Sequence, residues 1–217
     1  MVETFLLVLA ALFPIVNPPG TALVFLSMTA RASHVERRLL ARRVAINSFF
    51  VMAVAFLLGA LVLKFYGISI PVLRVAGGLI VAISGWKLLN EGNPKGEDAA
   101  QTGGKIEYSG LAFYPLTLPL TTGPGTIAVL ISLGFSRGVY IDFSQEARFV
   151  AAGLAATIAM AAFIYVCFAF SDRIERILGR GGTDIAVRLS AFILFCLGAQ
   201  IVWSGASELI RSVMVPA

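Results

Sequence analysis

Residues 13–21 read FPIVNPPGT, and residues 118–126 read LPLTTGPGT. Both stretches lie inside long apolar runs and bring proline and glycine into the middle of them. Proline has no N–H to donate, its ring clashes with the preceding turn, and the residue before it avoids helical backbone angles. We therefore expect a long helix to be interrupted at each of these two stretches.

Six apolar segments run along the chain, and each is about 20 residues or longer, enough to cross a membrane as a helix. They cover residues 4–30, 43–66, 70–90, 110–135, 148–170 and 186–210. Hydrophobic residues make up 58% of the sequence, charged residues make up only 13%, and the mean hydropathy is +0.88. A soluble domain carries about a quarter charged residues, so the surplus apolar surface predicts contact with lipid.

The two interrupted segments align with each other, which indicates an internal repeat. The residues that match at one constant spacing are Pro14 with Pro119, Pro19 with Pro124, Gly20 with Gly125, Thr21 with Thr126, Val24 with Val129, Ser27 with Ser132 and Arg43 with Arg148. Each half then holds three spans, and an odd number forces the two halves to insert in opposite orientations. We predict an all-α membrane protein with six transmembrane helices in two inverted three-helix repeats, in which helices 1 and 4 are discontinuous.

The predicted halves are residues 1–90 and 110–217, joined by a linker at residues 91–109. This linker reads EGNPKGEDAAQTGGKIEYS, which is rich in glycine and charge, so we expect it to lie in solvent. Most of the 17 Lys and Arg residues fall in the connections between spans 1–2, 3–4 and 5–6. Because basic connections tend to stay in the cytoplasm, these three are predicted to be cytoplasmic and both termini non-cytoplasmic.

Each predicted break needs polar surroundings, because a backbone group left unpaired in lipid costs several kcal/mol. A helix that restarts inside a membrane presents N–H donors and the positive end of its dipole, which suits a carboxylate. Carbonyl groups released before the breaks, around residues 13–16 and 118–121, suit an ammonium group or a coupling cation (Na⁺ or H⁺). Two breaks that point in opposite directions therefore fit a zwitterion.

The candidate substrate-binding residues come from the two breaks and from a lone amide in the second span. They are Asn17, Pro18, Pro19, Gly20, Thr21, Asn47, Thr121, Thr122, Gly123, Pro124, Gly125 and Thr126. For Asn47, an interhelical hydrogen bond competes with a role in binding. For the breaks, the competing interpretation is a proline kink that only shapes each helix.

Three stretches resemble the MarC family, which includes the SnatA neutral amino acid transporters. They read NPPGTALVFLSMT at residues 17–29, RVAGGLIVAISGWKLL at 74–89 and PLTLPLTTGPGTIAVLIS at 115–132. The resemblance covers essentially the whole chain and implies a six-span inverted-repeat carrier for glycine, alanine and similar amino acids. The family motif positions fall on Asn17, Pro18, Gly20, Gly123, Pro124 and Gly125. At Pro19 the chain departs from the family pattern, which commonly has an apolar residue there.

We expect a secondary active transporter of small neutral amino acids in the inner membrane, coupled to a cation or a proton. An exporter or a channel for other small solutes on the same scaffold is the alternative. An enzyme is not expected, because the sequence has one His, no HExxH or GxSxG motif and no carboxylate pair in a span. No cofactor is predicted, and the expected partners are the amino acid substrate and membrane lipid, with no nucleic acid.

Overall fold

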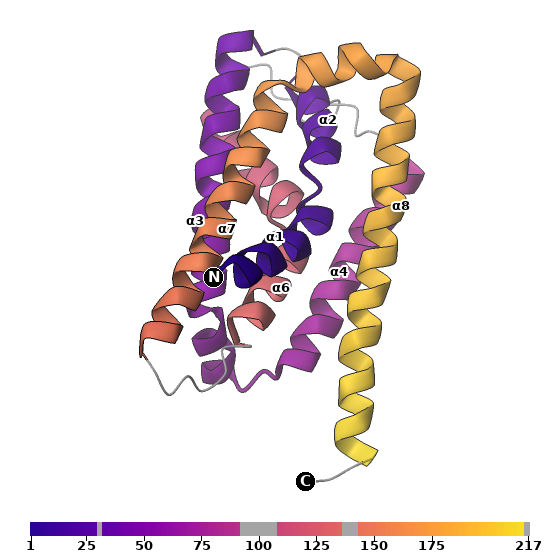
Figure 1. Cartoon of the computed structure of the whole chain (residues 1–217). Helices are drawn as coiled ribbons and strands as arrows, with labels where there is room; N and C mark the ends of the chain where they lie inside the picture. The colour runs from indigo at the N-terminus through magenta and orange to yellow at the C-terminus, as the bar shows by residue number, and fades with distance from the viewer. Residues whose placement is uncertain (30–31, 92–107, 136–142, 215–217) are drawn as a thin grey trace.

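The chain folds into a bundle of helices, most of which run along one common direction (Figure 1). The computed structural model describes residues 1–29, 32–91, 108–135 and 143–214. In order, the elements are α1 (Val2–Val16), α2 (Pro18–Met28), α3 (His34–Tyr66), α4 (Ile70–Glu91), α5 (Tyr108–Leu111), the π-helix η1 (Ala112–Thr121), α6 (Pro124–Phe135), α7 (Phe143–Ala169) and α8 (Ser171–Met214).

Five stretches of helix among the described residues are long and apolar enough to cross a membrane, and the number rises to six if η1 and α6 form one span. The five are Val2–Leu26, His34–Tyr66, Ile70–Asn90, Ser144–Ala169 and Ile185–Met214. Between η1 and α6 the chain bends by 65° at a short break. The protein is therefore an all-helical, multi-pass membrane protein, as its composition predicts.

Two helices extend beyond the apolar segments that predict them. The helix predicted from residue 43 begins at His34, because Ser33 and Glu36 form a capping box. The Glu36 N–H donates to Ser33 Oγ at 3.3 Å, and the Ser33 N–H donates to the Glu36 carboxylate at 2.8 Å. Such a cap starts a helix regardless of hydropathy. A further helical stretch precedes the span predicted from residue 186: α8 begins at Ser171, Gly179, with φ 68°, forms a kink, and the apolar part is Ile185–Met214.

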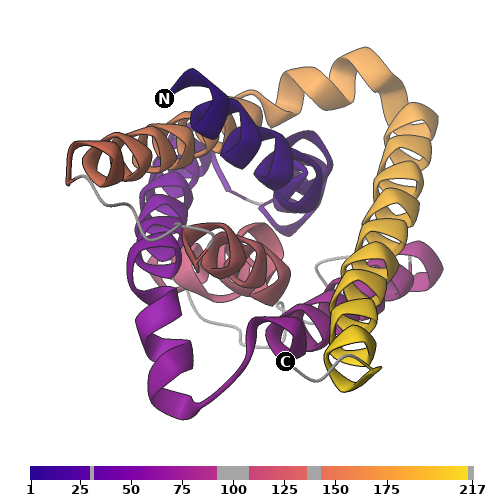
Figure 2. The same cartoon turned by 60° about the horizontal axis from the view of Figure 1, so that its bottom comes forward.

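The two breaks lie inside the bundle. In Figure 2, α2 and α6 lie between α3 and α7 on one side and α4 and α8 on the other, while α1 runs inward from the edge of the bundle, where the N-terminus lies. Helices α1 and α2 pack against α7, and α2 also packs against α8. In the same way, η1 and α6 pack against α3, and α6 also packs against α4. Each interrupted span therefore contacts helices from the other half of the sequence.

The outer surface of the bundle is apolar. On α3, Phe50, Leu61 and Phe65 are 59%, 64% and 83% exposed. Soluble proteins rarely leave large apolar patches in water, so these side chains are placed to face lipid. Inside the bundle, the rings of Phe25 and Phe168 stack with their centroids 4.5 Å apart, which joins α2 to α7.

Helices α4 and α8 run side by side and approach each other at glycine. A Cβ added to Gly85 would lie 2.5 Å from the backbone nitrogen of Phe195, and one added to Gly198 would lie 2.3 Å from that of Ala82. Only glycine permits this backbone contact, which is typical of helix pairs in membranes. Helices α4 and α8 therefore form a closely packed pair beside the interrupted spans.

The predicted connections 1–2 and 5–6 meet at the same end of the bundle. The guanidinium of Arg37, near the start of α3, forms an ion pair with Asp172, near the start of α8. It also donates to the carbonyl oxygen of Thr29, just after α2, at 2.9 Å. Arg37 is buried, and these partners satisfy its charge and its donors.

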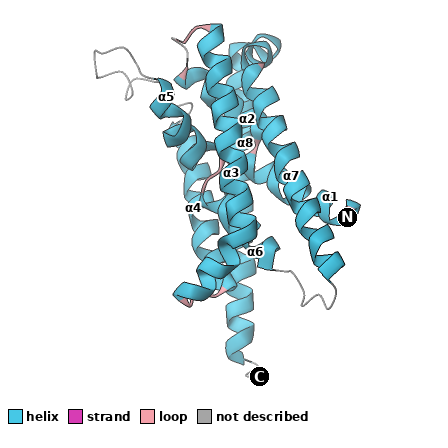
Figure 3. Ribbon diagram, turned by 90° about the vertical axis from the view of Figure 1, so that its left-hand side faces the viewer, coloured by secondary structure: helices cyan, strands magenta, loops and turns pink. Residues whose placement is uncertain are grey.

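The two chain ends lie at different heights in the bundle. The C-terminus lies at its lower end, while the N-terminus lies about halfway up its side (Figures 1 and 3). The orientation of both termini relative to the cytoplasm stays a prediction. The predicted linker falls almost wholly outside the described residues, since residues 92–107 belong to no described element.

Candidate functional site

The first break is a single residue, Asn17, between α1 and α2. Its backbone is left-handed, with φ 44° and ψ 60°, a conformation that Asn adopts more readily than most residues. Its side-chain oxygen accepts a hydrogen bond from the Gly20 N–H at 3.4 Å, while Pro18 and Pro19 occupy the first helical positions. Asn17 is therefore the N-cap of α2, and two prolines follow it in the first turn.

The backbone N–H groups at the first break are either absent or already hydrogen-bonded. Pro18 and Pro19 carry no N–H, the Gly20 N–H bonds to the Asn17 side chain, and the Thr21 N–H bonds to the Asn17 carbonyl at 2.9 Å. The Asn17 N–H in turn donates to the carbonyl of Phe13 at 2.9 Å. The expectation that α2 offers open N–H groups, and that Phe13 offers an open carbonyl, is therefore wrong at this break.

The second break is longer and has a different internal structure. Pro115 and Pro119 lie within η1, and the residue before each of them has an extended backbone, as proline requires. The hydroxyl groups of Thr117, Thr121 and Thr122 donate to carbonyl oxygens five residues earlier, at 2.6, 2.6 and 3.1 Å. These side chains occupy the carbonyl groups of Ala112, Leu116 and Thr117 and hold the wide turns of η1 in place.

The N-terminus of α6 has no side-chain cap. Pro124 begins this helix, and the preceding residue, Gly123, has no side chain that could accept a hydrogen bond. The N–H groups of Gly125 and Thr126 donate to no acceptor among the described residues. Thr126 also lines the cavity described below, and its hydroxyl makes no hydrogen bond to a described residue. The second break therefore keeps the open donors that the first break lacks.

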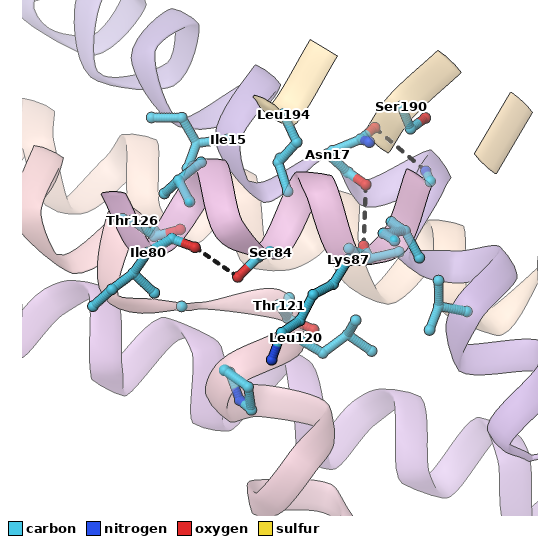
Figure 4. Close-up of a pocket in the computed structure, with 18 of the residues that line it drawn as sticks. Ile15, Asn17, Ile80, Ser84, Lys87, Leu120, Thr121, Thr126, Ser190 and Leu194 are labelled. Atoms are coloured by element: carbon cyan, nitrogen blue, oxygen red, sulfur yellow. Dashed lines mark hydrogen bonds between the residues drawn. The ribbon is translucent and has the colours of Figure 1, made fainter. Parts of the chain in front are cut away.

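A cavity of about 370 Å³ lies between the two breaks. Its wall is formed by the break residues and by one face each of α4 and α8, while no described residue of α3 or α7 lines it. Figure 4 shows Asn17, Thr121, Thr126, Ser84 and Ser190 around this space. Small-molecule sites have volumes of roughly 300–1,000 Å³ and are mostly apolar with a few polar groups, as this wall is.

Most of the predicted binding residues meet at this cavity. Those that line it are Asn17, Gly20, Thr21, Thr121, Gly123, Pro124, Gly125 and Thr126. Pro18, Pro19 and Thr122 do not line it, and the Thr122 hydroxyl is already bonded to Thr117. Asn47 does not line it because it lies on α3, which does not border the cavity. Substrate binding by any of these residues stays a prediction.

Helices α4 and α8 add polar residues that the site prediction did not include. Ser84 and Lys87 line the cavity from α4, and Ser190 lines it from α8. Ser84 and Lys87 lie three residues apart and so share one helix face. Ser190 lies against the first break, since a Cβ added to Gly20 would be 2.8 Å from its hydroxyl oxygen. In the sequence, no motif around these residues identifies them as site residues. The only available signal is the helical spacing that places Ser84 and Lys87 on one face.

Arg74 joins three of these helices at the other end of α4. Its guanidinium nitrogen Nη2 donates to the Ser132 hydroxyl of α6 at 2.6 Å, and Nη1 pairs with Glu208 of α8 at 2.6 Å. Arg188, which aligns with Arg74 when the third apolar segments of the two halves are compared (RV at residues 74–75, RL at 188–189), is exposed. The two arginines therefore have different surroundings in this structure.

Known proteins resemble the chain over nearly its full length. A family model described as MarC family integral membrane protein matches residues 2–210. The inner membrane proteins MarC of Salmonella typhimurium and Citrobacter koseri are each 34% identical to it over 210 residues, which cover 94% of both chains. The inner membrane protein MarC of Escherichia coli O1:K1 / APEC is 35% identical over the same share. No solved structure matches the chain. The chain therefore belongs to the MarC family of integral membrane proteins.

Proposed function

We propose that this protein is a secondary active transporter of small neutral amino acids in the inner membrane. One observation carries the proposal: residues of both breaks line a single cavity inside a bundle of membrane-spanning helices. Discontinuous helices that meet at a central site are typical of secondary transporters. The names of the relatives support the inner membrane as the location.

The polar groups of the cavity suit a zwitterion. Open N–H groups at Gly125 and Thr126, with the Thr126 hydroxyl, are donors for carboxylate oxygens. The side-chain oxygens of Asn17 and Ser190 lie at the other break and are acceptors for an ammonium group. Apolar residues of α4 and α8 complete the wall and suit a short aliphatic side chain.

The packing of the two halves supports alternating access. Helix α3 packs against η1 and α6, and α7 packs in the corresponding way against α1 and α2. Contacts of α4 with α6 are likewise matched by contacts of α8 with α2. An inverted repeat of residues 1–90 and 110–217 accounts for this pattern. Exchange of the two halves' conformations would then expose the cavity to each side of the membrane in turn.

Uptake into proteoliposomes tests the function directly. Labelled glycine, alanine and leucine are supplied while Na⁺ and proton gradients are imposed separately. We expect saturable uptake of glycine and alanine that one of the gradients drives, which would also identify the coupling cation. Uptake that does not saturate and needs no gradient would indicate a channel. Absence of uptake of all three amino acids would refute the proposal.

A matched pair of glycine substitutions tests the site. Gly125 lines the cavity beside Val81, and even a Cβ there would lie 1.8 Å from Val81 Cγ2, so Gly125→Leu is expected to displace Val81, block this part of the cavity and abolish uptake. Gly110→Leu is the control, because a Cβ at Gly110 meets no atom within 4 Å. Both variants are compared for the amount of folded protein recovered from the membrane. Normal uptake by well-folded Gly125→Leu protein would show that the second break only bends its helix.

A further inference from the structure

The cavity contains an unexpected positive charge. Among its described lining residues, Lys87 is the only one with a charged side chain, and none carries a carboxylate. The ion pairs formed by described residues involve His34, Arg37 and Arg74, and none of them involves Lys87. Its ammonium group is therefore not neutralised by any described part of the protein.

The position of Lys87 places this charge where solutes would enter. Lys87 is exposed and lies near the end of α4, which ends at Glu91. Met28, the last residue of α2, lines the same cavity. The cavity therefore extends from the breaks to the ends of α2 and α4, and Lys87 lies at this mouth.

The direction of the side chain distinguishes Lys87 from an ordinary interfacial lysine. A lysine that only anchors a helix end extends along the surface towards water. In Figure 4, the Lys87 side chain instead extends from α4 into the space that Leu120 and Thr121 of η1 also line. A fixed cation in a cleft with apolar walls attracts anionic groups and repels cations, because such walls screen charge poorly.

We infer that Lys87 selects solutes by charge: together with the open donors of the second break it binds a carboxylate, and it disfavours solutes whose only charge is positive. The inference rests on the proposed function only in placing the solute in this cavity. It narrows the substrate class to solutes that carry a carboxylate. Amino acid amides and amines of similar size would then be poor substrates, although they fit the same volume.

Ligand-dependent thermal unfolding of the purified, full-length protein tests this inference without requiring transport. The probes are propionate, which has only the carboxylate, alanine, and alaninamide, which has only the positive charge. A ligand that binds the folded state raises the unfolding temperature, and the concentration dependence gives the apparent Kd. Wild-type protein is compared with Lys87→Gln, Lys87→Arg and Lys87→Glu, with Lys64→Gln as the control at an exposed lysine outside the cavity.

We expect Lys87→Gln to weaken binding of propionate and alanine about tenfold, the effect of losing one charge-assisted hydrogen bond. Lys87→Arg and Lys64→Gln should bind like the wild type, and Lys87→Glu should improve the binding of alaninamide. Raising the salt concentration should weaken propionate binding in the wild type but not in Lys87→Gln. If Lys87 had only a structural role, propionate binding would not show this difference in salt dependence, and Lys87→Glu would not improve the binding of alaninamide.

Equal affinities of the wild type and Lys87→Gln for propionate and alanine would overturn the inference, as would a wild type that binds no carboxylate. Lysine-dependent binding of propionate without uptake of amino acids would refute the proposed transport and leave the role of Lys87 standing. If amino acid uptake occurs and both uptake and binding are unchanged in Lys87→Gln, the role of Lys87 would be refuted and the proposed transport would stand. The two proposals can therefore fail separately.

Discussion

The two breaks occupy aligned positions in the sequence but differ in structure. Asn17 aligns with Thr122, and Pro18 aligns with Gly123. Asn17 adopts a left-handed backbone and its side chain bonds forward to Gly20, which caps α2. Thr122 is β-branched and does not adopt that backbone, and its hydroxyl bonds backward to Thr117. The helix after it is therefore left without a cap.

This difference assigns distinct chemistry to the two breaks. At the first break, prolines and the Asn17 cap leave no open N–H group up to Thr21. At the second break, the N–H groups of Gly125 and Thr126 stay open to a ligand. A repeated motif therefore does not imply a repeated binding site. In this protein the anion-binding end of the proposed site belongs to the second break.

The largest expected effect comes from filling the second break. A Cβ on Gly125 would lie 1.8 Å from Val81 Cγ2, whereas one on Gly20 would meet the more movable Asn17 amide at 2.4 Å. We expect Gly125→Ala to destabilise the protein by about 3 kcal/mol through overpacking, and Gly20→Ala to cost less. The measurement is unfolding of the purified variants in detergent. Adding Val81→Ala should restore much of the loss in Gly125→Ala, and failure of that rescue would contradict the contact.

A smaller effect is expected from removing the cap of the first break. Asn17→Ala loses the bond to Gly20 and places a residue with a Cβ at φ 44°, which together cost about 2 kcal/mol. Asn17→Gly keeps the backbone conformation without strain and should cost only about 0.5 kcal/mol. Unfolding measurements on the two variants separate these contributions. Equal stabilities would mean that the left-handed backbone at residue 17 does not matter.

The smallest effect distinguishes two threonines of the second break. The Thr121 hydroxyl donates to the Leu116 carbonyl at 2.6 Å, so Thr121→Val should cost about 1 kcal/mol of stability. Thr126 lines the cavity and its hydroxyl bonds to no described residue, so Thr126→Val should leave stability unchanged but weaken alanine binding several-fold. Unfolding with and without alanine measures both. If Thr126→Val binds alanine normally, the carboxylate does not contact this hydroxyl.

Much of the fold could be predicted from the sequence, because its causes are local. Hydropathy predicts the membrane-spanning helices, and proline and glycine predict both interruptions. The cap at Asn17 follows from one side chain and the residues directly after it. The helix start at His34 lies outside the apolar segments, because capping and not hydropathy decides where α3 begins.

The tertiary structure alone decided which groups face the cavity. Ser84, Lys87 and Ser190 join the break residues because α4 and α8 pack beside the interrupted spans, while Asn47 is excluded because α3 packs elsewhere. It also decided that the aligned breaks differ in their open donors, since those depend on hydrogen bonds made in three dimensions. The physical reason is that a sequence pattern describes one helix at a time. A cavity, in contrast, is formed by faces of several helices that are distant in the chain.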